Sequence, residues 1–393
     1  MVRTIVILGA SYTGVPIAHY LLKHTIAKVE SLKVIIVAPN THMYWNVAAV
    51  RGILPGLMDD NKLFLPLAPA FAKYPSDRYE LVRGVAERVD PASNIVEVRG
   101  NDGSSRTIRY DELVIATGSS FKSEMPFKNL GSTEKTKEAL HSWAQRIKSA
   151  KSIVVAGAGP TGVEVAGELG QAYGVTGKKQ ITLICDQDLP FSSKFRREVR
   201  ETAKKELERL KVKVITGAKV TFSPTPSPSS KTVTISNTST SEKTTLQVDL
   251  VIPTFGIVPN TSYLPPSMLD TRGFVKQTRF LRAEGHADIF VVGDARNLEE
   301  SQGVHADAQL VHVVKLIEAR LLGQGGAAGG VAEYKPADKV VFAATLGPNK
   351  GTGQMGNWKI WSWLVTMLKG KHLGTNYAGA FVRGERTAGV KDW

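Results

Sequence analysis

The chain has 393 residues, of which 42% are apolar and 22% charged, a composition typical of a globular protein with two or three domains. Its 50 Lys and Arg outnumber 36 Asp and Glu, which gives a net charge of +14, but the charge is dispersed and forms no basic stripe interleaved with aromatic residues, so nucleic-acid binding is not expected. The single cysteine, Cys185, excludes an internal disulfide and a C-x-x-C redox pair.

The N-terminal residues show no export signal. The apolar run after Met1 is too short for a signal peptide, and no stretch approaches the roughly 20 apolar residues that span a bilayer. We therefore expect a cytoplasmic protein without a transmembrane segment, which could lie on the cytosolic face of an organelle membrane. Nothing in the sequence selects an oligomeric state.

The first predicted element is a strand, Thr4 to Leu8, that leads into a glycine turn and then a helix. Such a turn binds a dinucleotide pyrophosphate at the N-terminus of the helix. The next strand, Val34 to Val37, is followed by Ala38, where an acidic residue that binds ribose is usual, so Asn40 becomes a candidate for that contact. The turn consists of Gly9, Ala10, Ser11, Tyr12, Thr13 and Gly14, with Ser11 in place of the usual middle glycine.

A second glycine turn follows the strand that begins at Ser152. Gly157 is expected to form the tight turn, Gly159 to let the backbone approach a pyrophosphate, and Gly162 to let the new helix pack on its strand. The context of strand, turn and helix makes this a stronger indication than the glycine pattern alone.

The next strand, Ile181 to Ile184, is followed by Cys185 and Asp186. An acidic residue at this place favours NADH, and no basic residue that could bind a 2′-phosphate lies between Cys185 and Pro190. Lys194, Arg196 and Arg197 could swing in, so NADH is favoured without excluding NADPH. Cys185 is expected to be a small buried residue at the strand end.

Three further segments resemble landmarks of two-dinucleotide flavoproteins. The strand Glu112 to Ala116 ends at Thr117 and Gly118, where such proteins cross from the FAD domain into the NAD(P)H domain. The segment Leu250 to Asn260 resembles the return crossing. The strand Ile289 to Val292 ends at Gly293 and Asp294, and in such flavoproteins this aspartate binds the ribityl chain of FAD. The order of these segments, together with the two glycine turns, matches that architecture.

The motifs together resemble those of the apoptosis-inducing-factor-like family of FAD-dependent oxidoreductases, in the branch that contains ferroptosis suppressor protein, the mitochondrion-associated inducer of death and their fungal relatives. A wider resemblance is to type II NADH dehydrogenases. The motifs that carry the resemblance are WNVAAVRG (45–52), ATG (116–118), GAGPTGVEVAGE (157–168), VVGD (291–294), VHADA (304–308) and LGPNKGTGQMG (346–356).

The resemblance implies an α/β fold with two Rossmann-like dinucleotide-binding domains: an FAD domain formed by residues 1–120 and 255–330, an NAD(P)H domain formed by 121–254, and a small C-terminal segment, 331–393. It implies noncovalent FAD, NADH or NADPH as donor, and a quinone as electron acceptor. It places FAD against residues 9–14, Arg51, the backbone of Val82, Thr117, Gly118 and Asp294. The family's C-terminal lysine near the flavin has no counterpart in Tyr377 to Phe381.

The C-terminal segment contains WKIWSWLVTMLK, residues 358–369. Its apolar and polar residues separate on a helical wheel, which predicts an amphipathic helix about 18 Å long, too short to span a bilayer. Two interpretations stay open: the apolar face packs on the FAD domain or a second subunit, or it contacts a membrane peripherally. Two low-complexity stretches, 223–245 and 323–330, are expected to form an exposed hairpin and a hinge.

The function expected from these features is an FAD-dependent NAD(P)H oxidoreductase that takes a hydride from NAD(P)H and delivers electrons to a quinone-like acceptor. The cofactors supply the chemistry, so no catalytic acid or base is assigned. Glu164, one turn into the second glycine-turn helix, is the candidate to orient the nicotinamide. Two alternatives remain open: a cell-death effector with secondary redox activity, and a flavoenzyme of a secondary-metabolite pathway.

Overall fold

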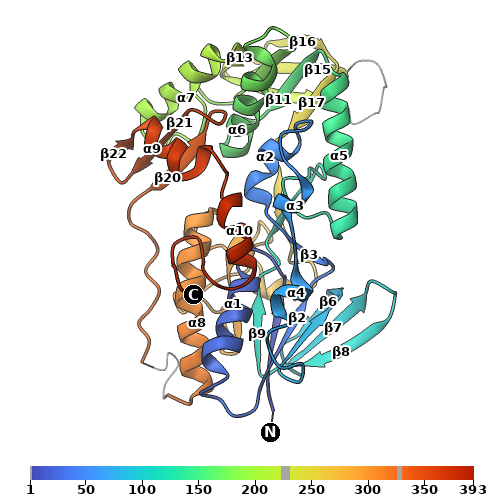
Figure 1. Ribbon diagram of the computed structural model, residues 1–393. Coiled ribbons are helices and arrows are strands. Elements are labelled where there is room, and N and C mark those ends of the chain that lie inside the picture. Colours follow the sequence, from blue (N-terminus) through green and yellow to red (C-terminus); the bar gives the residue numbers. More distant parts are fainter. Residues whose placement is uncertain (1, 223–230, 325–329) are drawn as a thin grey trace.

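A computed structural model describes residues 2–222, 231–324 and 330–393 (Figure 1). Two parallel sheets, each with helices packed against it, confirm the predicted α/β class with two Rossmann-like units. The predicted strands are observed, with small differences at their ends. No helix among the described residues is long and apolar enough to cross a membrane.

The first sheet has five parallel strands in the order β19-β9-β1-β2-β5. Alternating residues of its central strand face opposite sides: Ile5 and Ile7 pack with helices α1 and α8, whereas Val6 and Leu8 pack with a three-stranded antiparallel sheet, β6-β7-β8. The bounds are β1 Arg3–Leu8, β2 Leu32–Val37, β5 Tyr79–Val82, β6 Gly84–Asp90, β7 Ile95–Gly100, β8 Ser105–Arg109, β9 Glu112–Ile115, β19 Ile289–Val291, α1 Gly14–Tyr20 and α8 Gly303–Leu321.

The second sheet has four parallel strands in the order β13-β12-β11-β17, and a second antiparallel sheet, β14-β15-β16, packs near it. Strands β15 and β16 pair as a hairpin, as predicted, but the hairpin is not wholly exposed, because Val233 and Ile235 are buried against the second sheet. Residues 223–230 and 325–329 of the two low-complexity stretches lie outside the described residues. The bounds are α5 Thr133–Ser149, β11 Ser152–Ala156, α6 Pro160–Leu169, β12 Gln180–Ile184, α7 Arg197–Arg209, β13 Val212–Ile215, β14 Ala218–Phe222, β15 Lys231–Asn237, β16 Lys243–Val248 and β17 Leu250–Pro253.

The two units are joined by two short strands that pair antiparallel, β10 (Ser119–Phe121) and β18 (Ile257–Pro259). The first sheet thus takes strands from both sides of the second unit in the sequence, and on this basis we propose domain limits of 1–120 with 255–330, 121–254, and 331–393. The smaller elements of the first unit are β3 His42–Tyr44, α2 Ala49–Gly52, α3 Asp60–Leu63, β4 Phe64–Pro66 and α4 Leu67–Phe71.

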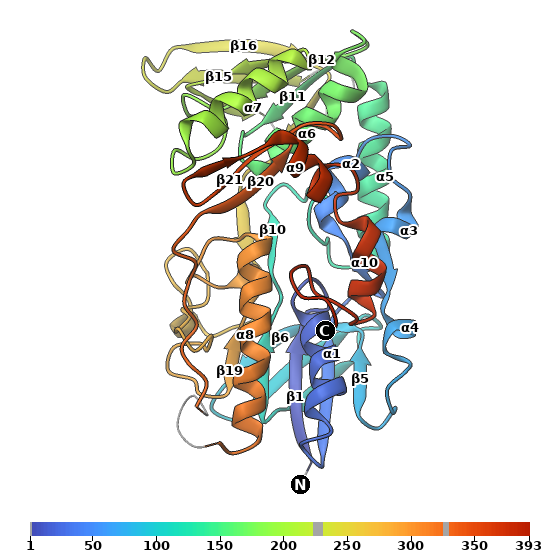
Figure 2. The ribbon, with the colours of Figure 1, turned by 60° about the vertical axis from the view of Figure 1, so that its left-hand side comes forward.

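The C-terminal segment forms a third antiparallel sheet, β20-β21-β22, that contacts α6 and α7, followed by short helices of which α10 contacts α1 (Figure 2). The chain then returns to the first unit, where the Trp393 indole is buried and donates a hydrogen bond of 2.8 Å to the Pro16 carbonyl. The bounds are β20 Val341–Thr345, β21 Gly351–Met355, β22 Trp358–Ile360, α9 Ser362–Val365 and α10 Thr375–Val382.

The predicted amphipathic helix over 358–369 is wrong in its first third. Trp358–Ile360 forms strand β22, which pairs antiparallel with β21, and helix begins only at Ser362. From Thr366 to Gly370 it continues as a π-helical turn. Trp358 is aromatic and Ile360 is β-branched, and both types suit a strand. Pairing with β21 therefore favours a strand over a helix at these residues.

One buried carboxylate of the first sheet gives stability a pH dependence. Glu112, at the start of β9, pairs with Arg320 of α8, yet burial outweighs that pairing and raises the pKa of Glu112 to about 7. This folded-state pKa exceeds the ~4.3 of an exposed glutamate, so the protonated form of Glu112 favours the folded protein. Its contribution to the free energy of unfolding is complete below about pH 4.3 and is lost as the pH rises through about 7.

We therefore expect Glu112 to lower the free energy of unfolding by up to about 3 kcal/mol between about pH 4.5 and about pH 8. Buried His19, whose pKa is lowered to about 3, contributes in the opposite direction in both proteins, so the expected result is a difference between wild type and Glu112→Gln, which cannot lose a proton. Denaturant unfolding of both proteins at the two pH values measures this difference. The same pH dependence in the two proteins would contradict the assignment.

Candidate functional site

The first glycine turn joins β1 to α1 at the carboxyl edge of the first sheet, where ligands of open α/β sheets bind. Gly9 has a φ of +110°, and a Cβ there would lie 2.3 Å from the Ala116 carbonyl oxygen. A Cβ on Gly14 would lie 1.9 Å from the Gly9 carbonyl oxygen. Both positions therefore require glycine, and the turn has the tight form that brings backbone N–H groups to a phosphate.

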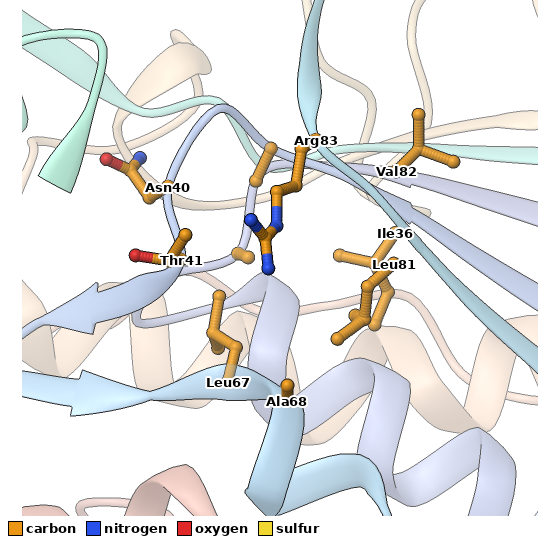
Figure 3. A pocket seen from close by; sticks show the side chains of 10 residues that line it. Ile36, Asn40, Thr41, Leu67, Ala68, Leu81, Val82 and Arg83 are labelled. Carbon is orange, nitrogen blue, oxygen red and sulfur yellow. The ribbon is translucent and has the colours of Figure 1, made fainter. Parts of the chain in front are cut away.

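A cavity of about 110 Å³ lies beside this turn, at the ends of β1, β2 and β5 (Figure 3). Its walls are largely apolar, and Arg83 extends into it. The Asn40 side-chain oxygen is buried and has no hydrogen-bond partner among the described residues, so it is available to a ribose hydroxyl. Its lining residues are Ala10, Ile36, Ala38, Asn40, Thr41, Leu67, Ala68, Leu81, Val82 and Arg83.

Val82 lines the cavity as expected, but its carbonyl already accepts a hydrogen bond of 3.0 Å from the Ala38 N–H. The cavity therefore has the features that the nucleoside half of a dinucleotide needs: apolar walls, a free buried acceptor and a glycine turn alongside.

Asp294 lies close to the same turn, because a Cβ on the adjacent Gly293 would lie 3.2 Å from the Thr13 hydroxyl oxygen. Its carboxylate accepts hydrogen bonds from Ser119 Oγ at 3.0 Å and from Lys128 Nζ at 2.6 Å. Burial alone would raise the pKa of Asp294, but the Lys128 ammonium and these hydrogen bonds outweigh it and lower the pKa. The group is a half-buried carboxylate that can accept a ligand hydroxyl.

Tyr12, Thr117 and Gly118 are engaged by neighbouring protein groups. The Tyr12 ring packs on Phe381 of α10, with 5.1 Å between ring centroids. The Thr117 hydroxyl donates to the Asn260 carbonyl at 2.7 Å, and the Gly118 carbonyl accepts a bond of 3.0 Å from the Asn260 N–H. Thr117 and Gly118 thus tie the two crossing segments together, and their predicted cofactor contact stays a prediction.

Arg51 connects all three parts of the chain. Its guanidinium forms a two-pronged ion pair with Glu168 of α6, at 2.7 and 3.0 Å, and donates to the Gly370 carbonyl at 2.9 Å. Both side chains are buried. This buried ion pair joins α2 to α6, and removing either partner would leave a buried unpaired charge. The predicted contact of Arg51 with FAD is untested by this geometry.

The second glycine turn repeats the geometry of the first between β11 and α6. Gly157 has a φ of +101°, and a Cβ on Gly162 would lie 1.9 Å from the Gly157 carbonyl oxygen. Gly159 differs: no described atom lies within 4 Å of the place that its Cβ would take. The space over Gly159 is thus open to a ligand.

Glu164, in the second turn of α6, is buried at the contact with the C-terminal segment. Its carboxylate accepts hydrogen bonds from Lys369 Nζ at 2.6 Å and from the Thr345 N–H at 3.0 Å. Lys369 thus brings a lysine of the C-terminal segment to Glu164, while the expectation that Tyr377 to Phe381 holds no counterpart of the family's lysine near the flavin stays a prediction. Sequence reasoning placed Lys369 on the polar face of a helix but gave no signal for its partner.

The end of β12 shows which polar groups are available there. Cys185 is buried, and its thiol donates to the Leu189 carbonyl at 3.2 Å, while burial raises the pKa of the thiol. Asp186 is exposed. Arg200 pairs with Asp188 at 2.7 Å, and Arg197 pairs with Glu201 at 2.7 Å, so these cations are directed at carboxylates of their own unit.

A metal centre is not indicated. Across residues 2–222, 231–324 and 330–393, no group of three or more His, Cys, Asp or Glu side chains could hold an ion.

Comparison with known proteins identifies a family with this architecture. Residues 3–313 match the family described as pyridine nucleotide-disulphide oxidoreductase. The oxidoreductase ptaL of Pestalotiopsis fici is 38% identical over 370 residues, which is 93% of this chain and 95% of that protein. Ferroptosis suppressor protein 1 of Homo sapiens is 24% identical over 380 residues, 94% of this chain and 93% of that one. These relatives confirm the resemblance drawn from the motifs.

Solved structures show the same fold. The sulfide:quinone oxidoreductase of Aquifex aeolicus superposes with a TM-score of 0.75 at 16% identity, over 98% of this chain and 92% of that one. NDH2 of Plasmodium falciparum in complex with NADH superposes with a TM-score of 0.69 at 13% identity, over 98% of both chains.

Proposed function

Because this chain belongs to the pyridine nucleotide-disulphide oxidoreductase family, we propose that it is an FAD-dependent NAD(P)H oxidoreductase that delivers electrons to a quinone-like acceptor. The observation that carries the proposal is the pair of glycine turns of matching geometry, one in each parallel sheet. When bound, FAD supplies the redox chemistry by accepting a hydride from the nicotinamide and passing two electrons to the acceptor. The single cysteine excludes an internal disulfide as that acceptor.

In this proposal the first unit holds FAD. The turn from Gly9 to Gly14 binds the pyrophosphate, the cavity beside Asn40 takes the adenosine, and Asp294 accepts a ribityl hydroxyl. Lys128, which no sequence motif indicates, keeps Asp294 charged. Arg51, Val82, Thr117 and Gly118 complete the set of residues proposed for this site.

The second unit holds NAD(P)H. Gly157, Gly159 and Gly162 bind its pyrophosphate, and the space over Gly159 admits it. Glu164 is held by two hydrogen bonds from the C-terminal segment, which gives it the fixed position that orienting a nicotinamide needs. We propose NADH as the preferred donor, because Asp186 is exposed at the end of β12 while Arg197 and Arg200 are paired with carboxylates.

A quinone acceptor is supported by the names of relatives with this fold, among them a sulfide:quinone oxidoreductase. We also propose a cytoplasmic protein on the cytosolic face of a membrane. Two alternatives stay untested: a flavoenzyme that acts on a metabolite of a secondary pathway, and a cell-death effector with secondary redox activity.

A steady-state screen of the purified flavoprotein with NADH and NADPH, against a panel of quinones and a panel of carbonyl and alkene compounds, tests the proposal. We expect quinones to stimulate oxidation well above the rate with oxygen alone, and NADH to have the higher kcat/KM. Oxidation that no quinone stimulates would refute the acceptor, and preference for a metabolite carbonyl or alkene would favour the flavoenzyme of a secondary pathway.

Cys185→Ser is expected to leave this turnover intact, with at most a change in the preference between NADH and NADPH. The thiol is buried and only donates to the Leu189 carbonyl, a bond that a serine hydroxyl can also form. Steady-state kinetics of both proteins with each nucleotide, at equal flavin content, provide the check. Complete loss of activity in a folded, flavin-loaded variant would show that the thiol takes part in the chemistry.

A further inference from the structure

The C-terminal segment exposes a group of large apolar side chains, here called the indole patch. It consists of Met355, Trp358, Trp361, Trp363, Met367 and Leu368. The exposed fraction is 81% for Trp358, 70% for Trp361 and 61% for Trp363. Trp361 and Trp363 lie side by side, with 6.1 Å between ring centroids. Clusters of exposed apolar side chains mark contact sites for proteins or membranes.

The patch is exposed because the helix over Ser362–Gly370 turns polar residues toward the protein, whereas the polar face of a typical surface helix points to solvent. In this helix the polar face points into the protein: Ser362 Oγ accepts a bond of 3.0 Å from the Gly351 N–H, and Lys369 pairs with Glu164 at 2.6 Å. Val365 is the one residue of α9 that is buried. Trp363, Met367 and Leu368 of the helix are exposed, which is unfavourable in water and calls for a partner.

The charge of the segment shows what kind of partner fits. From Lys339 to Gly384 the sequence contains no Asp or Glu, but it contains Lys339, Lys350, Lys359, Lys369, Lys371 and Arg383. Lys339, Lys359 and Lys371 are exposed. Lys369 and Arg383 pair with Glu164 and Glu385, whereas the three exposed lysines form no ion pair with any described residue. A surface that combines indoles with such exposed cations matches an anionic membrane surface, where indoles lie at headgroup depth and each cation adds attraction to the lipid.

We propose that the indole patch docks this protein on the surface of an anionic lipid bilayer. The helix from Ser362 to Gly370 is far too short to span a bilayer, so the contact is peripheral. This attachment depends on the patch alone and not on which electron acceptor the enzyme uses. Lys369 connects the same short helix to Glu164, so docking places the candidate site close to the membrane surface.

Co-sedimentation with lipid vesicles tests the proposal. We expect the wild-type flavoprotein to pellet with vesicles of phosphatidylcholine and phosphatidylglycerol, to bind pure phosphatidylcholine more weakly, and to be released by salt. Trp361→Glu/Met367→Glu should lower the partition coefficient at least about tenfold. Val175→Glu changes an exposed apolar residue outside the patch and should bind as the wild type does. Equal flavin content and circular dichroism confirm that each variant is folded.

The wild type also provides a test that requires no variant: brominated lipids placed in the vesicles should quench its tryptophan fluorescence. A wild type that stays in the supernatant and is not quenched would overturn the proposal. So would a patch variant that pellets as the wild type does. If light scattering then shows a wild-type dimer and a monomeric patch variant, the patch is an interface between two copies of this chain.

Discussion

Gly159→Val should abolish reduction of the bound flavin by NADH and NADPH while leaving the flavin in place. The backbone at Gly159 has a φ of −69°, which valine adopts readily, and no described atom lies within 4 Å of the place its Cβ would take. The fold should therefore tolerate the change. The valine side chain would instead occupy the space through which the pyrophosphate must approach.

We expect the rate of flavin reduction at a fixed nucleotide concentration to fall at least about a hundredfold, since even a small displacement of the nicotinamide costs about that much. Stopped-flow bleaching of the flavin absorbance measures it. Gly159→Ala, which adds only a methyl group, should have an intermediate effect, and an unchanged flavin content is the control for folding. Bleaching of the valine variant at the wild-type rate would disprove the assignment of the second glycine turn.

Asp294→Ala should produce a protein that loses most of its flavin. The substitution removes the acceptor proposed for the ribityl chain and leaves the Lys128 ammonium without the partner it has at 2.6 Å. Loss of a charge-assisted hydrogen bond costs roughly 1.5 to 3 kcal/mol, which corresponds to flavin binding weaker by about tenfold to 150-fold.

The flavin-to-protein absorbance ratio after gel filtration, and titration of the stripped protein with FAD, measure this effect. Asp294→Asn keeps the shape and an acceptor oxygen and should lose less flavin. Asp270→Ala removes another carboxylate whose pKa is lowered, in this case by hydrogen bonds within its own turn, and should retain flavin. Wild-type flavin affinity in Asp294→Ala would remove Asp294 from the site.

Sequence reasoning found the two glycine turns because the information they need is local. The φ of Gly9 and the contact of Gly14 with the Gly9 carbonyl arise within a few residues, and glycine alone satisfies them. The flanking strands were equally evident, since short β-branched runs next to such turns are buried strands of a parallel sheet. The fold class followed from these two units.

Contacts between distant segments could not be predicted. Lys128 lies in a loop without a motif and reaches Asp294 only because β10 passes the end of β19. Lys369 reaches Glu164 only after the β20-β21-β22 sheet has packed on α6. In neither case does the spacing along the sequence record the contact.

The predicted helix at 358–369 failed for a related reason. The wheel correctly separated apolar from polar residues, but it could not show that Trp358–Ile360 pairs with β21, or that the polar face would be turned inward by Ser362 and Lys369. Periodicity describes an amphipathic element without stating which face contacts the protein.

Anaerobic titration of the purified flavoprotein shows directly whether the protein passes electrons from NADH through its flavin to a quinone. We expect one equivalent of NADH to bleach the bound flavin and one equivalent of a water-soluble quinone then to restore its absorbance, with no other component present. A protein that binds no flavin, a flavin that NADH and NADPH leave oxidised, or a reduced flavin that the quinone does not reoxidise would contradict the proposed function.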